Sequence, residues 1–262
     1  MTGLDSNKVS DWLVHEVDDY DLASFIPVAA RFGQERFGYV VTPNVDHLVR
    51  YSEDPVFRGH YRTADYVLLD SRFAAYALRI VKGVRLRVCT GSDLTAELLS
   101  TTATPSDRIV IIGGSREQAD VIAELHGLTN MRHYNPPMGF AQDFEAVDEC
   151  LQFIESHSPF RFCFLAVGSP QQELLAALLQ ARGIARGLAL CVGASLNFIT
   201  GREKRAPHWM QQLALEWLFR LAQDPQRLAN RYLVRGPRFF GHLRRAQYVP
   251  RKNTAGAAAP GS

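Results

Sequence analysis

The strongest constraint in this sequence is a repeated alternation of short apolar runs with longer stretches of helical composition. The apolar runs are Gly38–Val41, Tyr66–Leu69, Arg108–Ile112, Phe162–Val167 and Leu188–Val192. Helical stretches follow the first four, as far as Arg62 and then over Arg72–Val81, Ser115–His126 and Gln171–Ala181. Apolar strands that alternate with helices are typical of β-α-β units, in which helices cover both faces of a parallel sheet. The sequence therefore predicts an α/β fold.

The pattern changes after Gly201, where the apolar runs stop. Helical sequence follows over Trp209–Ala222 and Gln226–Val234, and Gly236-Pro237 is expected to break the second of these helices. Residues 253–262 are of low complexity. We therefore predict an α/β domain over residues 1–200, a helical appendage over residues 201–252 and a disordered tail over residues 253–262.

The formal net charge of +2 combines two regions of opposite charge. Residues 201–262 contain twelve basic and three acidic residues, a net charge of +9, whereas residues 1–200 have a net charge of −7. The spacing of Arg220, Arg227, Arg231 and Arg235 places these four cations on one helical face. This asymmetry indicates an anionic partner for the basic segment, such as a membrane surface, a nucleic acid or a phosphate ligand.

Composition excludes several classes of protein. Hydrophobic residues make up 47% of the chain and charged residues 21%, which is typical of a globular protein rather than a disordered one. No apolar run approaches the ~18 residues of a spanning helix, and the polar segment Met1–Asp11 has no signal-peptide core. The four cysteines form no CxxC pair and the eight histidines no HxxxH pair. We therefore expect a reduced, cytoplasmic protein without a metal site or a disulfide framework.

The loops that follow the strands are the expected location of the functional site. In an open parallel sheet, ligands bind beyond the carboxyl ends of the strands. The candidate loops are Thr42-Pro43-Asn44, Asp70-Ser71, Gly113-Gly114-Ser115, Gly168-Ser169-Pro170-Gln171-Gln172-Glu173 and Gly193-Ala194-Ser195.

Each candidate also has a purely structural interpretation. Gly113 and Gly114 are suited to a phosphate cradle, or to a tight turn before a Ser115 N-cap. Asp70 is suited to general-base catalysis, or to capping the helix that follows. Asn44 is open to the same two interpretations, as a ligand contact or as an N-cap.

Two further motifs favour structural roles. Ser169, Pro170 and Gln172 match an N-cap, a first helical residue and the third position of a capping box. Asp19-Tyr20-Asp21 matches a DxD motif, which holds a metal in some sugar transferases, but it precedes the first strand. We interpret it as the exposed start of a helix.

Several motifs occur together and in the order found in one known family. They are Thr42-Pro43-Asn44, Asp70, Arg87 with Gly91-Ser92-Asp93-Leu94, Gly168 to Glu173, Val192-Gly193 with Gly201, Arg205-Ala206-Pro207, and Leu215-Glu216-Trp217-Leu218-Phe219-Arg220 with Pro225 and Arg227. On these residues the chain resembles the WecG/TagA/CpsF family of bacterial glycosyltransferases, roughly from Gly38 to Tyr232. The motifs after Arg205 are the specific ones.

The resemblance implies a Rossmann-like catalytic domain and an inverting, metal-independent transfer. A sugar would pass from a UDP-sugar to a saccharide on a polyprenyl-diphosphate carrier, at the cytoplasmic face of the cell membrane. The products would be precursors of surface polysaccharides or of teichoic-acid linkage units.

The resemblance also implies roles for individual residues. Asp70 is the expected base, Thr42 and Asn44 line the active site, and Arg87 and Gln172 contact the phosphates and the donor. The remaining expected contacts of the donor or the diphosphates are Gly113, Gly114, Gly193, Arg205, Arg220 and Arg227.

The chain departs from the family pattern at a few positions. Ser71 replaces the usual Gly after the base, and Gln171 replaces a usual Lys. Asn197 stands where relatives often have Asp. The spacing that follows Arg87 is one residue longer than usual, so Arg85 is an alternative phosphate contact. These departures leave the donor sugar open.

The basic C-terminal segment has alternative interpretations. The structural interpretation is a solvated basic face packed on the core. The functional ones are docking to an anionic membrane surface, which the cations suit together with Phe239 and Phe240, and nucleic-acid binding by the same cations. The acidic first 200 residues and the lack of a nucleic-acid motif favour the membrane, so we expect no nucleic-acid partner. A non-catalytic protein that only binds nucleotide sugars is a further alternative.

Overall fold

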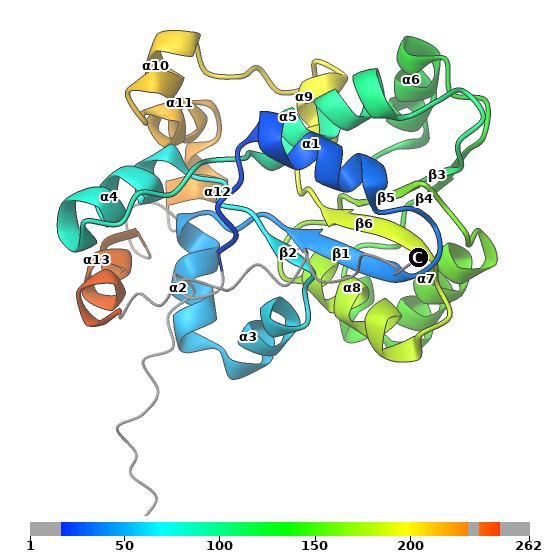
Figure 1. The fold of residues 1–262 in the computed structure, drawn as a ribbon, viewed down its shortest axis with the longest axis horizontal. Coiled ribbons are helices and arrows are strands. Elements are labelled where there is room, and N and C mark those ends of the chain that lie inside the picture. The colour runs from blue at the N-terminus through cyan, green and yellow to red at the C-terminus, as the bar shows by residue number, and fades with distance from the viewer. Residues whose placement is uncertain (1–16, 230–235, 247–262) are drawn as a thin grey trace, which may run out of the picture.

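The computed structural model describes residues 17–229 and 236–246, and its centre is one parallel sheet (Figure 1). The sheet has six strands in the order β2-β1-β6-β5-β3-β4, and every pair of neighbours is parallel. The strands are β1 (Phe37–Val41), β2 (Tyr66–Val67), β3 (Ile109–Ile112), β4 (Met131–Tyr134), β5 (Phe162–Leu165) and β6 (Gly187–Cys191). The predicted α/β, Rossmann-like architecture is confirmed.

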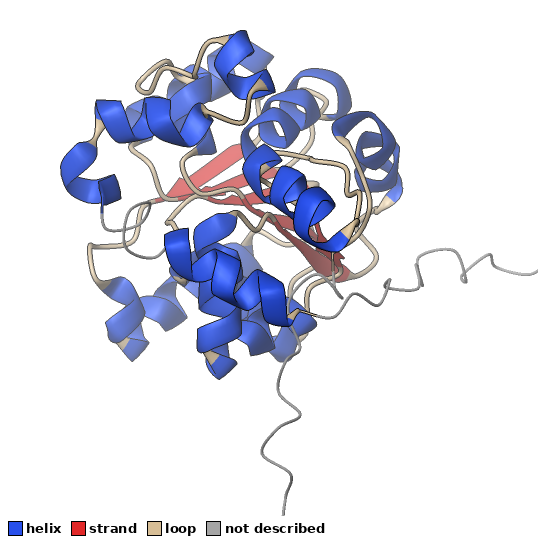
Figure 2. Cartoon of the chain, turned by 90° about the vertical axis from the view of Figure 1, so that its left-hand side faces the viewer, coloured by secondary structure: helices blue, strands red, loops and turns tan. Residues whose placement is uncertain are grey.

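Helices cover both faces of this sheet (Figure 2). One apolar cluster contains buried residues of α2 (Val45–Glu53), α3 (Pro55–Arg62), α4 (Arg72–Lys82), α7 (Phe144–Ser156), α8 (Gln171–Arg182) and α13 (Gly236–Arg245). The cluster on the opposite face contains residues of α1 (Leu22–Arg31), α5 (Gly91–Glu97), the π-helix η2 (Leu98–Thr102), α6 (Arg116–His126) and α9 (Ser195–Ile199). A short 3₁₀ helix, η3 (Phe140–Gln142), precedes α7.

The central strands are apolar because both of their faces are covered. Every residue of β1, β3, β5 and β6 is buried. The sequence analysis missed β4, whose sequence MRHY contains no apolar run. Because β4 lies at the edge of the sheet and its residues are partly or fully exposed, it does not need one.

Cap residues set where the helices begin. The single helix predicted as far as Arg62 is divided into α2 and α3 at Asp54, whose carboxylate accepts from the amides of Val56 and Phe57 while Pro55 opens α3. The DxD motif is a helix start, as predicted, because Asp21 and Ser24 form a capping box at α1.

The C-terminal region differs in detail from the prediction. The predicted helix Trp209–Ala222 is two helices, α10 (His208–Gln212) and α11 (Glu216–Gln223), and α12 (Pro225–Ala229) follows. Ala214, between α10 and α11, has a φ of 58°. Arg231, Arg235 and the predicted tail over residues 253–262 lie outside the described residues.

The helix α13 was not predicted, and it starts at the Gly236-Pro237 pair that was expected only as a break. Its Phe239 and Leu243 are fully buried in the same apolar cluster as α2 and α4. Docking of Phe239 to a membrane is therefore wrong, because its side chain is part of the core. Phe240, by contrast, is 45% exposed.

Two other sequence expectations can be compared with the described residues. No helix within them is both long enough and apolar enough to cross a bilayer. Cys89, Cys150, Cys163 and Cys191 are buried free thiols, which agrees with the absence of a disulfide framework.

Candidate active site

The loops identified from the sequence meet at one edge of the sheet, beyond the carboxyl ends of the strands. β1 and β6 are neighbours there, with Val41 paired to Cys191. After β1 the chain moves outward to β2, whereas β5, β3 and β4 lie on the other side of β6. Such a change of direction opens a crevice in a parallel sheet.

A polar cavity of about 500 Å³ fills this crevice. It is lined by residues from the loops after β1, β2, β3, β5 and β6 and from helices that include α8, α9 and α11. They include Thr42, Asn44, Asp70, Gly114, Gly168, Ser169, Gln172, Gly193, Ser195, Phe198, Glu216 and Arg220.

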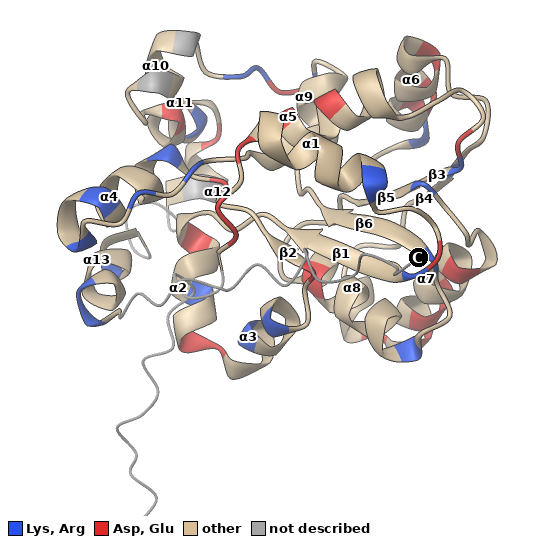
Figure 3. Cartoon of the chain, in the orientation of Figure 1, with Lys and Arg blue, Asp and Glu red and all other residues tan. Residues whose placement is uncertain are grey.

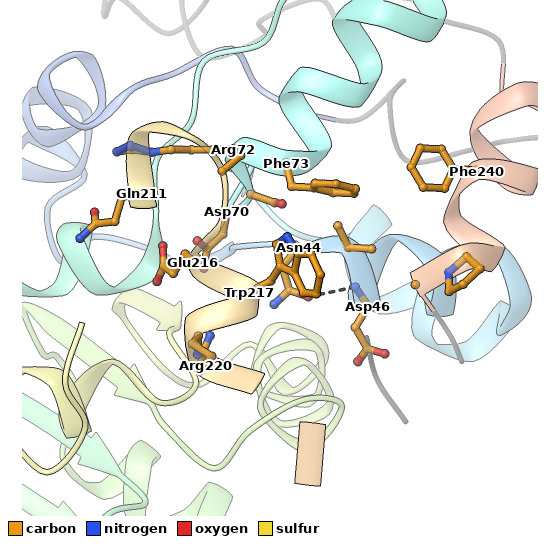
Figure 4. Close-up of a pocket in the computed structure, with 15 residues that line it drawn as sticks. Asn44, Asp46, Asp70, Arg72, Phe73, Gln211, Glu216, Trp217, Arg220 and Phe240 are labelled. Atoms are coloured by element: carbon orange, nitrogen blue, oxygen red, sulfur yellow. Dashed lines mark hydrogen bonds between the residues drawn. The ribbon is translucent and has the colours of Figure 1, made fainter. Parts of the chain in front are cut away.

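A second cavity of about 300 Å³ adjoins the first and is more apolar (Figure 4). Its aromatic and apolar residues come from α2, α4, α11, α13 and the turn between α10 and α11: Val45, Phe73, Ala214, Trp217, Pro237 and Phe240. Both cavities are lined by Asn44, Asp46, Asp70, Glu216 and Arg220. These five residues therefore form a wall shared by the two cavities, and ligands bound in the two cavities would both contact it.

Asp70 occupies this wall at the end of β2. Its backbone amide donates to the Pro43 carbonyl at 2.8 Å, which joins the loop after β2 to the loop after β1. The N-cap of α4 is Ser71, whose hydroxyl accepts from the Ala74 amide at 3.1 Å. The Asp70 carboxylate is therefore not needed as a cap, and of its two interpretations the capping one is wrong.

The surroundings of Asp70 favour its protonated form. Burial raises its pKa to about 7; a hydrogen bond from the Gly91 amide opposes this, and the Glu216 carboxylate adds to it. The Arg220 guanidinium lowers the pKa by a smaller amount. A carboxylate with a pKa near neutrality is suited to accept a proton at neutral pH.

Asn44 and Thr42 organise the loop after β1. Asn44 is the N-cap of α2 and accepts from the amides of Asp46 and His47 at 3.1 and 3.4 Å. Because it also lines both cavities, its two proposed roles are compatible. Thr42 directly follows β1, and its hydroxyl donates to the carbonyl of Cys191 at the end of β6 at 3.0 Å.

Gln172 links two loops of the polar cavity. Its Oε1 accepts from the Gly193 amide at 2.8 Å, and its Nε2 donates to Glu173 at 2.9 Å. The predicted capping box is wrong, because Pro170 is the N-cap of α8 and no side chain caps this helix. Gln172 is only 2% exposed and lines the cavity while it holds Gly193 in place.

The loop after β3 is a tight turn with a capped helix, as its structural interpretation predicted. Ser115 and Gln118 form a capping box at α6. A Cβ on Gly113, where φ is +95°, would lie 2.8 Å from the Ala166 carbonyl oxygen, so this position requires glycine. Gly114 lines the polar cavity, and Gly113 does not.

Asn197, one of the departures from the family pattern, belongs to a network beside this turn. Its Oδ1 accepts from Gln118 Nε2 at 2.9 Å, and its Nδ2 donates to Glu203 at 2.9 Å. The amide thus joins α6 to the start of the C-terminal region, with both of its polar atoms in use.

The expected cationic residues are divided between the site and other locations. Arg220 lines both cavities, lies 5.5 Å from the Phe198 ring centroid and pairs with Glu203 at 3.9 Å. Arg205 contacts the same ring at 5.9 Å and forms a salt bridge with Asp93. The side chain of Arg227 lies outside the described part of the structure.

Arg87 lies away from both cavities. Its backbone amide donates to the Asp19 carboxylate at 2.8 Å, and its guanidinium donates to the Asp19 carbonyl at 2.6 Å. Asp21 lies 3.7 Å from the same guanidinium. Arg85 is exposed and likewise does not line either cavity.

Glu216 and Trp217 are prominent in the site, but the sequence analysis assigned them no role. Both stand in the Leu215–Arg220 motif that carried the family resemblance, which was the signal available for finding them. Both residues line the apolar cavity, and Glu216 lies close enough to Asp70 to raise its pKa (Figure 4). Local pattern alone could not bring them there, since α11 reaches the sheet edge only through tertiary packing.

The described residues include no group of three or more His, Cys, Asp or Glu side chains that could hold a metal ion. The model of one protein family, described as Glycosyl transferase WecG/TagA/CpsF family, matches residues 11–253.

Proposed function

Because the chain belongs to the WecG/TagA/CpsF family of glycosyltransferases, we propose that it moves a sugar from a UDP-sugar to a polyprenyl-diphosphate-linked saccharide. The family indicates surface-polysaccharide biosynthesis. We further propose that the reaction inverts the anomeric configuration, needs no metal ion and takes place at the cytoplasmic face of the cell membrane.

The observation that carries the proposal is the position of Asp70 in the wall between two cavities of different character. The polar cavity has glycine-rich loops and hydrogen-bonding side chains, which suit a nucleotide sugar. The apolar cavity has the aromatic residues Phe73, Trp217 and Phe240, which suit the acceptor saccharide and the start of its lipid. Donor and acceptor would then meet beside Asp70.

The reaction is a single displacement. The Asp70 carboxylate removes the proton of the acceptor hydroxyl, and the oxygen of that hydroxyl attacks the anomeric carbon. The bond from the anomeric carbon to the diphosphate oxygen breaks on the opposite face of the sugar, so UDP leaves and the configuration inverts.

The charge that develops on UDP requires positive groups in the polar cavity. Arg220 meets this requirement from α11, and the glycine loop at Gly114 brings backbone close to the bound diphosphate. We assign the main cationic role to Arg220 because it lines both cavities, whereas Arg87 lies beside Asp19.

The test is incubation of the purified protein with a panel of UDP-sugars and a synthetic lipid-diphosphate saccharide. We expect one UDP-sugar to yield UDP and a product extended by one sugar, with inverted anomeric configuration by NMR and an unchanged rate in EDTA. Binding of a UDP-sugar without transfer to any acceptor would instead indicate a non-catalytic protein. A rate that depends on a divalent cation would remove the metal-independent part of the proposal.

A further inference from the structure

The helix α4 exposes large apolar side chains between cations. Tyr76 is 62% exposed and Ile80 is 64% exposed. Arg72 lies four residues before Tyr76 and Arg79 three residues after it, so both cations are on the exposed face of the helix, while Ala74, Ala77 and Leu78 face the core. This helix belongs to the α/β body and not to the basic C-terminal segment.

The helix α13 lies beside α4 and extends the same surface. Lys82 donates to the Arg244 carbonyl at 2.8 Å, and the Phe73 ring lies 6.0 Å from the ring of Phe240. The exposed residues that α13 adds to this surface include Phe240 and Arg244. We call the exposed residues Arg72, Tyr76, Arg79, Ile80, Phe240 and Arg244 the α4–α13 face.

The charge of these two helices is entirely positive. Neither α4 nor α13 contains an Asp or a Glu, and each contains three Lys or Arg residues. Figure 3 shows blue segments and no red ones on these two helices. The neighbouring Glu53 of α2 pairs with Arg238 and His242 at 3.5 and 3.1 Å. Within the described ranges, neither Arg72 nor Arg79 forms an ion pair.

The α4–α13 face borders the apolar cavity of the active site. Arg72 and Phe73 of α4 and Pro237 and Phe240 of α13 line that cavity, which reaches Asp70. A ligand anchored at this face would therefore lie next to the shared wall of the two cavities.

We infer that the α4–α13 face docks onto the surface of an anionic lipid bilayer. Cations that flank exposed aromatic and aliphatic side chains are suited to lipid head groups and to the outer part of the acyl layer. A symmetric contact with a second copy of the chain would place these cations against themselves, which Coulomb repulsion disfavours. The inference rests on the proposed function in that a lipid-linked acceptor would enter the adjacent cavity directly from the membrane.

The test is vesicle flotation of the full chain without substrates. One set of vesicles contains phosphatidylcholine with about 30% phosphatidylglycerol, and the other contains phosphatidylcholine alone. We expect the wild type to bind the anionic vesicles preferentially. The double variant Tyr76→Ser/Ile80→Ser should reduce the partition coefficient by about tenfold or more, and Arg79→Gln should reduce it about fivefold.

The chain provides matched controls on α6 and β4, away from this face. Val121 and Leu125 are 47% and 62% exposed, so Val121→Ser/Leu125→Ser removes comparable apolar surface. Arg132→Gln removes an exposed cation. We expect both controls to bind vesicles within about twofold of the wild type, because neither touches the proposed surface.

The inference would be overturned if Tyr76→Ser/Ile80→Ser bound vesicles like the wild type, or if the α6 control lost binding equally. It would also be overturned if the double variant changed only the oligomeric state measured by sedimentation, because the face would then serve self-association. A change in RNA binding alone would overturn it as well, because the face would then bind nucleic acid. Transfer to a short-chain, water-soluble acceptor distinguishes the two proposals. Normal vesicle binding without any transfer would reject the proposed function and leave the docking surface intact.

Discussion

Asp70 and Glu216 lie next to each other in the wall between the two cavities, although one follows β2 and the other begins α11 (Figure 4). The negative charge of Glu216 adds to the effect of burial and raises the pKa of Asp70. The C-terminal helices thus supply part of the electrostatic environment of the candidate base.

Replacement of Glu216 by Gln should shift the pH dependence of transfer. Asp70 must be deprotonated to accept a proton, so kcat/KM of the wild type should rise with pH through about 7. The Glu216→Gln variant lacks the neighbouring negative charge, so the pKa of Asp70 falls and the acidic limb moves to lower pH. The measurement is kcat/KM from pH 5 to 9. An unshifted limb would show that Glu216 does not act through Asp70.

The variants Asp70→Asn and Glu173→Gln should separate two carboxyl groups with similar pKa values. Burial raises both pKa values to about 7, but only Asp70 lines the cavities. We expect Asp70→Asn to stay folded and to lose about 10²–10⁴ in kcat, whereas Glu173→Gln should keep kcat within a few-fold of wild type. Comparable losses in the two variants would remove the specific role of Asp70.

The sequence was informative where local pattern controls structure. The buried strands β1, β3, β5 and β6 were predictable because both faces of each are covered, so their residues form continuous apolar runs. The edge strand β4 was not predictable, since Arg132 and His133 need no buried environment there. The loop position of Asp70 followed from the strand pattern, but the neighbouring Glu216 did not, because no local rule reports that α11 packs across the sheet edge.

Arg87 shows that a family motif can predict a role for a residue without revealing its neighbours in the fold. Its position in the family motif predicted a phosphate contact, but the motif does not reveal that Asp19 and Asp21 lie beside it. Arg220 was expected both in a cationic stripe and as a diphosphate contact, and it lines both cavities. Which cation faces the site depends on the packing of α11, which sequence spacing does not determine.

Kinetics of Arg220→Ala and Arg87→Ala should distinguish these two cations. Loss of the Arg220 charge should lower kcat about 10²-fold, because the group faces the leaving diphosphate in the proposed complex. Arg87→Ala should leave kcat and the donor KM within about twofold and change Tm by a few degrees at most, since its ion pairs are largely exposed. The reverse result would restore Arg87 as the phosphate contact.

Ala214 should tolerate glycine better than an ordinary helical alanine does. Its φ of 58° lies in the left-handed region, which costs a residue with a Cβ about 1–2 kcal/mol, and glycine avoids most of this cost. We therefore expect Ala214→Gly to keep or slightly raise the free energy of unfolding. The control Ala222→Gly, on an exposed position of α11, should lose up to ~1 kcal/mol. Urea denaturation measures both, and an equal loss would argue against strain at Ala214.

Asp70→Asn should also stabilise the protein, and the gain should grow with pH. The pKa of Asp70 is about 7 in the folded protein, compared with an ordinary value of 3.8. Between these values the folded protein binds this proton more tightly than the unfolded chain, so the ionised group destabilises the fold increasingly as the pH rises towards 7. Asparagine does not ionise and removes this penalty, which amounts to about 2–4 kcal/mol at pH 8 and almost nothing at pH 4. Urea denaturation of both proteins at the two pH values measures the difference. Equal gains at pH 4 and pH 8 would mean that Asp70 is not held near neutrality by its surroundings, and its assignment as the base would lose its electrostatic support.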